Sequence, residues 1–202
     1  MHQPSILNAV MPSIRDRFFS ADELLQIPDE ERFELWDGKL RERVVGTKAC
    51  WIAGNVASAV LRFAEHRSLG FAFGGGLGLQ IAAGRPNTVL RVSGAFLAAG
   101  RIPNDTLPDG HLTVAPELAI LVNSPHDEAD YVAEKTGLLL DSGVRLVWVI
   151  NPGARNSFVH RANGTVSVVR DDGALDGEDV LPGFSLPLAR VLGPRVPEPV
   201  DA

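Results

Sequence analysis

Two segments constrain the fold of this chain most strongly: LAILV at 118–122, which is continuously apolar, and VRLVWVI at 144–150, which is nearly all apolar or β-branched. Strands made almost wholly of apolar or β-branched residues are typically covered on both faces. The turn Asn123-Ser124-Pro125 ends the first run. Residues 127–142, between the runs, indicate a helix, because acidic side chains stand at its N-terminal end and Gly143 can stop it. The sequence therefore predicts two buried strands separated by a helix.

Shorter helices and strands surround these runs. Ser20 and Glu23 form a capping box that opens a short helix. Asp37-Gly38 and Asn163-Gly164 stand between alternating segments, as is typical of β-hairpins. The expected elements are a helix at 20–27, a hairpin at 32–45, an amphipathic helix at 48–67, a pair of strands joined by a tight turn at 70–81, a strand at 88–102, the strand at 115–122, the helix at 127–142, the strand at 144–152 and a hairpin at 156–170. This order predicts an α/β fold (α+β), with a mixed sheet flanked by helices.

Length and composition favour one soluble domain. The chain has 202 residues and 45% apolar content, enough for a substantial core. We assign residues 18–194 to the domain and 1–17 and 195–202 to tails, the second of which is rich in proline.

A net charge of −6 argues against a strongly basic surface that binds nucleic acid, although a local basic groove is compatible with it. Cys50 is the single cysteine, so neither an internal disulfide nor a thiolate metal cage can form. No apolar run approaches the ~20 residues that span a bilayer, so we expect a cytoplasmic protein without a membrane partner.

Five segments between Phe19 and about Gly193 form a recognisable series, in this order: ADELLQIPDEERFELWDGKL, VLRVSGAFLAAGRIP, APELAILVNSPHDE, EKTGLLLDSGVRLVWVINPGARNSFVHR and DVLPGFSLPLARVL. Through these segments the chain resembles the Uma-type restriction-endonuclease family of bacteria, a branch of the PD-(D/E)XK nuclease superfamily. The resemblance implies a restriction-endonuclease-like core, metal-dependent hydrolysis of phosphodiesters and DNA as a partner.

Hydrolysis of this kind requires hard oxygen ligands for Mg²⁺, usually at least two carboxylates from neighbouring strands, and a lysine or similar donor helps to position water. In the family, one acid follows a proline in the strand matching RVSGAFL, and another lies in the strand matching LAILVNSP. Those positions hold Gly94, after Ser93, and Leu121 in this chain. Glu34 matches an early glutamate and Lys135 matches a helix lysine. The resemblance thus implies that two catalytic remnants survive while both central metal ligands are replaced.

Neighbouring oxygen atoms offer a weak substitute for the missing acids. Asn123 shares a strand face with Leu121 at about 7 Å along the strand and offers a neutral carbonyl. Glu117 lies about 13 Å away in the other direction, too far to complete the same coordination shell. Asn123 with Glu34 would supply one carboxylate, so the site should bind Mg²⁺ weakly. Mg²⁺ is the expected cofactor if the protein is active, and none is expected otherwise.

Structural roles can also explain the candidate residues. Glu34 is compatible with a half-exposed strand position paired with a nearby Lys or Arg. Lys135 can lay its stem on the core and keep its amine in water. Lys39, Arg41 and Arg43 share one strand face and are candidates for contacts with a phosphate backbone, or they form a solvated hairpin face.

Two classes of function therefore compete. One is an active Mg²⁺-dependent DNA endonuclease. The other, which the replaced acids favour, is a pseudonuclease that keeps the fold and binds DNA, an active relative or a second copy of itself. Exposed apolar residues on the glycine-rich strands or on the hairpin 156–169 would indicate such a protein partner.

Overall fold

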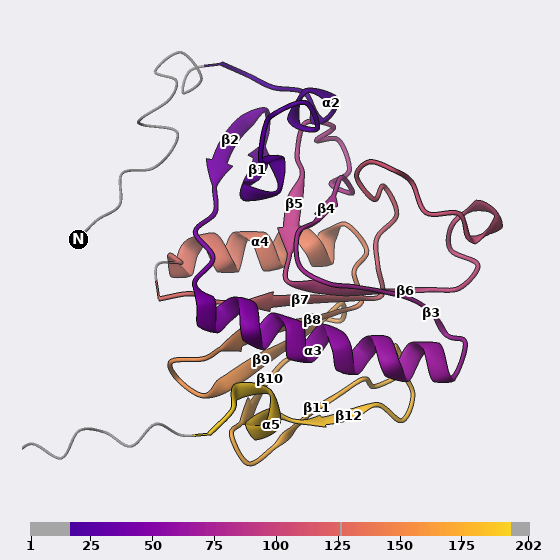
Figure 1. The fold of residues 1–202 in the computed structure, drawn as a ribbon, viewed down its shortest axis with the longest axis vertical. Coiled ribbons are helices and arrows are strands. Elements are labelled where there is room, and N and C mark those ends of the chain that lie inside the picture. Colours follow the sequence, from indigo (N-terminus) through magenta and orange to yellow (C-terminus); the bar gives the residue numbers. More distant parts are fainter. Residues whose placement is uncertain (1–16, 126, 195–202) are drawn as a thin grey trace, which may run out of the picture.

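A six-stranded mixed sheet forms the centre of the computed structural model, which describes residues 17–125 and 127–194 (Figure 1). The strand order is β10-β9-β8-β7-β6-β3, in which β7 and β8 run parallel and every other neighbouring pair is antiparallel. The strands are β3 (Gly70–Phe73), β6 (Gly94–Ala98), β7 (Leu118–Val122), β8 (Leu146–Asn151), β9 (Asn156–Arg161) and β10 (Val166–Arg170). The two apolar runs are therefore the central parallel pair, and the predicted mixed sheet flanked by helices is confirmed.

Two helices cover opposite faces of the sheet (Figure 1). Helix α4 (Ala129–Asp141) connects β7 to β8, and the long helix α3 (Thr47–His66) lies across the other face. Side chains alternate along a strand: within β7, Ala119 and Leu121 join the core under α4, whereas Leu118 and Ile120 join the core under α3. Burial on both faces explains why the sequence shows no polar alternation there.

A small N-terminal layer packs over the α4 side of the sheet. It contains α2 (Ala21–Leu24), the short helix η2 (Glu30–Arg32), and the hairpin of β1 (Phe33–Trp36) and β2 (Lys39–Glu42). The predicted capping box is present, with both Ser20–Glu23 hydrogen bonds formed. Asp37 and Gly38 have φ values of 47° and 85°, as the tight hairpin turn requires. The predicted hairpin is confirmed, and it brings β1 close to α4.

The segment 88–102, expected to be one strand, is two. A bend at Ser93 separates β5 (Leu90–Val92) from β6, and the chain passes there from a small sheet to the large one. The glycine-rich strands do not pair with each other either: β3 pairs with β6, and β4 (Leu77–Leu79) pairs with β5. Gly75, between β3 and β4, lies beside the Ser93 carbonyl. The segments β3–β4 and β5–β6 therefore pass between the two sheets at the same place. The alternation of residues along the sequence does not reveal this change of sheet.

The C-terminal part completes the core under α3. Strands β11 (Ala174–Asp176) and β12 (Ser185–Pro187) and helix α5 (Leu188–Leu192) pack on the same face as α3. The predicted hairpin at 156–170 is confirmed as β9–β10. The short helix η3 (Pro103–Asp105) lies between β6 and β7. The proposed tail boundaries stay predictions, because residues 1–16 and 195–202 lie outside the described part. Within that part, no helix combines the length and apolar character needed to cross a bilayer.

Candidate functional site

Glu34, in β1, is the centre of the candidate site. Its side chain is fully buried, so the prediction of a half-exposed strand position is wrong. Oε1 accepts hydrogen bonds from the backbone N–H of Arg91 at 2.7 Å and from Lys135 Nζ. Oε2 accepts hydrogen bonds from Trp36 Nε1 at 3.0 Å and from the Tyr131 hydroxyl. Each carboxylate oxygen therefore has two donors. Docking of the β1–β2 hairpin over α4 brings the donors from Tyr131 and Lys135 within reach.

Lys135 lies one helical turn after Tyr131 on α4, so both side chains reach Glu34 from the same helix face. Lys135 is buried, and its Nζ lies 3.2 Å from the Tyr131 hydroxyl. The prediction that its amine stays in water is therefore wrong. Lys135 and Glu34 therefore form a buried ion pair.

Burial and charge act in opposite directions on the pKa values of these groups. Burial lowers the pKa of Lys135 to about 8, against the opposing effect of the Glu34 charge. Burial alone would raise the pKa of Glu34, but the charges of Lys135 and Arg43 outweigh it and hold that pKa below its ordinary value. Arg43 Nε lies 3.9 Å from Glu34 Oε1. Burial, together with the Glu34 charge, raises the pKa of Tyr131, which stays a neutral donor.

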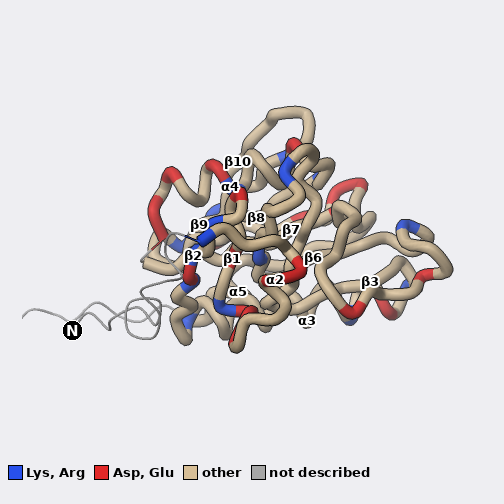
Figure 2. The backbone as a smooth tube through the Cα atoms, turned by 90° about the horizontal axis from the view of Figure 1, so that it is seen from above, with Lys and Arg blue, Asp and Glu red and all other residues tan. Residues whose placement is uncertain are grey.

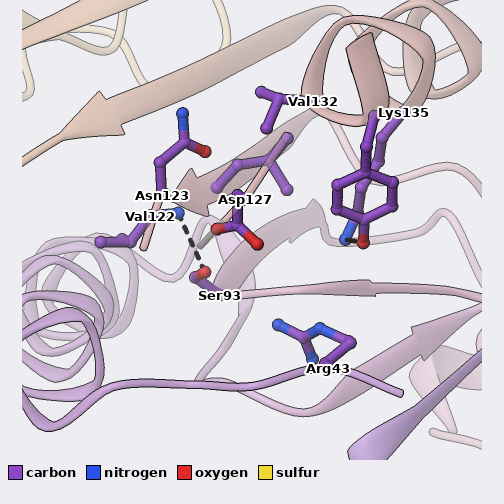
Figure 3. A pocket seen from close by; sticks show the side chains of 9 residues that line it. Arg43, Ser93, Val122, Asn123, Asp127, Val132 and Lys135 are labelled. Atoms are coloured by element: carbon purple, nitrogen blue, oxygen red, sulfur yellow. Dashed lines mark hydrogen bonds between the residues drawn. The ribbon is translucent and has the colours of Figure 1, made fainter. Parts of the chain in front are cut away.

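A small pocket of about 30 Å³ opens beside this ion pair. A space of this size holds about two water molecules. Its walls come from the segment after β2, the bend before β6, the end of β7 and the start of α4 (Figure 3). The lining residues are Arg43, Ser93, Leu121, Val122, Asn123, Asp127, Tyr131, Val132 and Lys135. The structure thus brings several of the sequence-predicted residues to one place.

The two strand positions that the family pattern assigns to acids face opposite sides of the sheet. Leu121 lines the pocket and is 5% exposed. A Cβ atom on Gly94 would instead lie 3.2 Å from Cδ1 of Ile120, in the apolar layer under α3. The preceding residue, Ser93, lines the pocket, and its Oγ accepts a hydrogen bond from the Val122 N–H at 3.0 Å. The assignment of a replaced acid to position 94 stays a prediction, but in this structure an acid at 93 would face the pocket.

Asn123 and Asp127 supply the remaining polar oxygens of the pocket. Asn123 Nδ2 donates to Asn151 Oδ1 at 2.6 Å, so its amide is fixed by the neighbouring strand. Asp127 Oδ2 accepts the Ser124 N–H at 2.6 Å, so its carboxylate helps to shape this turn. Among the residues lining the pocket, Asp127 has the single carboxylate, and it is exposed.

The three basic residues of the hairpin do not form one free basic track. Lys39 and Arg41 are exposed on β2, whereas Arg43 turns inward and lines the pocket. The Arg41 guanidinium lies 3.8 Å from the ring centroid of Tyr131, and its Nη2 lies 3.6 Å from Glu128 Oε2. Arg41, Arg43 and Tyr131 also line an adjoining cavity of about 100 Å³. Across the molecule, basic positions are interspersed with acidic ones (Figure 2).

The residues of the pocket do not fit a divalent-metal centre of the kind that hydrolyses phosphodiesters. Such a centre usually has at least two converging carboxylates. Glu34 already accepts four hydrogen bonds, Leu121 is apolar, and Asp127 stands alone on the pocket wall. Within residues 17–125 and 127–194, no three His, Cys, Asp or Glu side chains are close enough together to hold a metal ion.

Sequence reasoning missed four members of the site: Trp36, Ser93, Asp127 and Tyr131. Tyr131 had a usable signal, because a residue four positions before Lys135 lies on the same helix face. Trp36 is two residues after Glu34 on one strand, so it also shares a face. Ser93 and Asp127 depend on a strand bend and on a turn, which residue spacing does not predict.

Comparison with known proteins agrees with this fold. Residues 21–189 match the model of the Uma2 family, described as "Putative restriction endonuclease". The fold is similar to that of "a putative nuclease belonging to DUF820" from Anabaena variabilis ATCC 29413, with a TM-score of 0.72 and 19% sequence identity over 86% of this chain and 97% of that one. No curated protein matches the chain. The family model covers most of the sequence, and the chain therefore belongs to the Uma2 family, the "Putative restriction endonuclease" family.

Proposed function

We propose that this family member is a pseudonuclease, which keeps a nuclease-like fold but acts by binding nucleic acid or a protein partner. The observation that supports the proposal best is the burial and the hydrogen bonding of the Glu34 carboxylate. A metal ligand needs an oxygen lone pair directed into the site, but the Glu34 oxygens accept four hydrogen bonds and have no exposed surface.

The surroundings of Lys135 support the same conclusion. A lysine that assists phosphodiester hydrolysis must direct its charge toward the reacting phosphate and water. Here Lys135 is part of the pocket wall, but its ammonium group is paired with the buried Glu34 carboxylate. Leu121 places an apolar side chain where a second ligand would be needed. The pair therefore joins the hairpin to α4, which is a structural role.

The first experiment is nicking of supercoiled plasmid in Mg²⁺ or Mn²⁺. We expect no metal-dependent nicking by the natural chain. A Ser93→Asp/Leu121→Glu variant restores two carboxylates that face the pocket, and a Gly94→Asp/Leu121→Glu variant is its matched control, because its aspartate would enter the core under α3. Activity in the first variant alone would show that the scaffold lacks only its ligands. Robust nicking by the natural chain would refute the proposal.

A second candidate function, an active Mg²⁺-dependent DNA endonuclease with a rearranged metal site, rests on Asp127. Asp127, Asn123 and Ser93 place three oxygen-bearing side chains around one pocket. Nicking by the natural chain that disappears in Asp127→Asn would support this candidate. Ser142→Ala, a change at the far end of α4, controls for nonspecific effects on the helix.

Binding to nucleic acid is tested separately, without metal, by fluorescence anisotropy of a labelled DNA duplex. If phosphates contact the hairpin, affinity falls steeply with salt, and each lost cation reduces the logarithmic salt slope by about 1. Lys39→Ala and Arg41→Ala should each reduce that slope, whereas Arg190→Ala, on α5, should not. Salt-independent binding, or no binding, would leave a protein as the partner.

A further inference from the structure

We propose that the outer edge of β10 pairs with the same edge of a second copy of the chain, so that two six-stranded sheets join across a two-fold axis at Ser167. Val166 of each copy then lies opposite Val168 of the other. This inference goes beyond the proposed function, because it names a self-association that neither requires nor excludes a reaction in the pocket.

Apolar side chains are exposed on the last two strands of the sheet, on the same side as α4. Phe158, Val166 and Val168 are 38%, 53% and 47% exposed. Phe158 is the partner of Val168 in the β9–β10 register, and directly opposite residues share one face of a sheet, so these side chains form one surface. Val149, the neighbour of Phe158 on β8, is only 3% exposed. The cover that α4 gives to this face therefore ends between β8 and β9.

The backbone of β10 has an unpaired side. Within residues 17–125 and 127–194, β10 is the last strand of the sheet and pairs with β9 alone. The hydrogen bond from the Arg161 N–H to the Thr165 carbonyl shows which residues of β10 point toward β9. Hydrogen-bonded and non-hydrogen-bonded pairs alternate in an antiparallel ladder. The N–H and C=O groups of Val166 and Val168 therefore face away from the sheet, where another strand can bind them.

The sequence of β10 does not protect this edge. Natural proteins often protect an edge strand with lysine, proline or a bulge. The strand reads VSVVR, and its five residues pair with β9 in an unbroken register. Arg170, at the end of the strand, is its one charged residue. A regular, exposed and apolar edge of this kind indicates a strand that pairs with a further strand.

The two exposed valines make the edge complementary to itself. A two-fold axis perpendicular to the sheet pairs two copies of one strand in antiparallel directions and leaves each face of the sheet on its own side. With the axis at Ser167, Val166 and Val168 of opposite copies form hydrogen-bonded pairs, each of which exchanges both N–H···O bonds. The same pairing gathers the exposed valines and Phe158 of both copies into one apolar cluster. A second copy therefore satisfies both the backbone and the side chains of this edge.

The end of the strand favours this register over its neighbour. A shift of the second strand by two residues would place Arg170 opposite Val166 of the second copy. The Arg170 carbonyl also accepts a hydrogen bond from the Gly173 N–H at 2.9 Å, so it is less available to a new strand. In the proposed register Arg170 lies opposite Gly164, where an added Cβ atom would meet no other atom within 4 Å. The long side chain of Arg170 then has room.

The size of the interface predicts a weak dimer. One strand edge and a small apolar cluster from each copy bury less than the ~1,600 Å² of a standard interface, so we expect a dissociation constant of about 10–100 μM. The contacts are apolar or between backbone groups, so higher salt should not weaken the dimer, whereas binding to nucleic acid falls steeply with salt. Self-association and the proposed function can therefore fail independently.

Sedimentation velocity at protein concentrations on both sides of this range tests the dimer. The natural chain should change from monomer to dimer. Val168→Lys places a charge in the apolar cluster and should raise the dissociation constant about ten-fold or more. Leu61→Lys is the matched control, because Leu61 is 39% exposed on α3 and lies outside the edge. Thermal unfolding of dilute protein shows that each variant is folded. A natural chain that stays monomeric, or equal weakening by both substitutions, would overturn the proposal.

Disulfide cross-linking tests the register. All variants carry Cys50→Ser, which removes the exposed natural cysteine. Ser167→Cys should form an intermolecular disulfide, because the two copies of this residue are a non-hydrogen-bonded pair with Cα atoms about 4.5 Å apart. Thr165→Cys is the matched control, since its two copies lie about 13 Å apart along the strands, too far for a disulfide. Equal cross-linking at both positions, or none by Ser167→Cys at concentrations where the chain dimerises, would overturn the proposed pairing.

Discussion

Replacement of Lys135 by Met is expected to destabilise the protein by about 3 kcal/mol at pH 7, because it leaves the charge of Glu34 buried without its closest cation. Removal of one partner of a buried ion pair costs about 3–5 kcal/mol. The lower end applies here, since Arg43 Nε stays 3.9 Å away and the hydrogen bonds from Trp36 and Arg91 remain. Met has nearly the length of Lys, so little cavity forms.

Urea unfolding of four chains measures this effect: the natural chain, Glu34→Gln, Lys135→Met and the double variant. In the double variant no buried charge is left unpaired, so it should recover about 2 kcal/mol relative to Lys135→Met. Glu134→Met, an exposed position on the same helix, is the matched control and should change stability by less than about 0.5 kcal/mol. Equal losses in Lys135→Met and in the double variant would refute the reasoning.

The pH dependence of stability should differ in sign between the natural chain and Lys135→Met. In the natural chain the pKa of Glu34 is lowered on folding, so its contribution is complete above the unfolded value near 4.5 and is lost as pH falls through the lower folded value. Without Lys135, burial dominates and raises that pKa above 4.5. The variant should therefore lose stability as pH rises from 4.5 to its folded pKa. Urea unfolding at about pH 3, 4.5 and 7 distinguishes the two signs, because the natural chain should lose stability below pH 4.5 and the variant above it.

Two further substitutions test the geometry. Gly94→Asp should lower the free energy of unfolding by about 3 kcal/mol, because it buries a carboxylate beside Ile120. Ser93→Asp should change the free energy of unfolding by less than about 1 kcal/mol, because this position lines the pocket. Equal losses of the two variants in thermal unfolding would show that both positions face the core. Gly38→Ala should cost about 1–2 kcal/mol, since φ is +85° and the new Cβ would lie 2.9 Å from Phe18 Cδ1. An unchanged melting temperature would indicate that this turn relaxes freely.

The elements of the fold were largely predictable because local signals and burial agree in them. The runs at 118–122 and 144–150 are covered on both faces, and the Asp37-Gly38 turn has the backbone conformation that its residues favour. The break at Ser93 was not predictable. Residues 88–92 and 94–97 are buried on both sides of it, since both the small and the large sheet bury their strands. Sheet membership is a tertiary property, and strand propensity does not encode it.

The sequence predicted which residues form the site better than it predicted the contacts between them. The family pattern led to Glu34 and Lys135, and the structure brings them into direct contact. The expected exposure of both was wrong, because the exposure of Glu34 depends on how the hairpin docks over α4. Arg43 was grouped with Lys39 and Arg41 by strand periodicity, but it follows the end of β2 and turns toward Glu34.

The contact between Glu34 and Lys135 also bears on what constrains the residues at these two positions. Both residues lie between a hairpin and a helix that are far apart in the sequence, so a substitution of either one weakens folding whether or not the protein cuts DNA. An acid facing the pocket from β7 has no such second role, and Leu121 fits there without loss of packing. Stability alone is therefore a sufficient physical reason for the glutamate and the lysine at these two positions, independent of any reaction in the pocket.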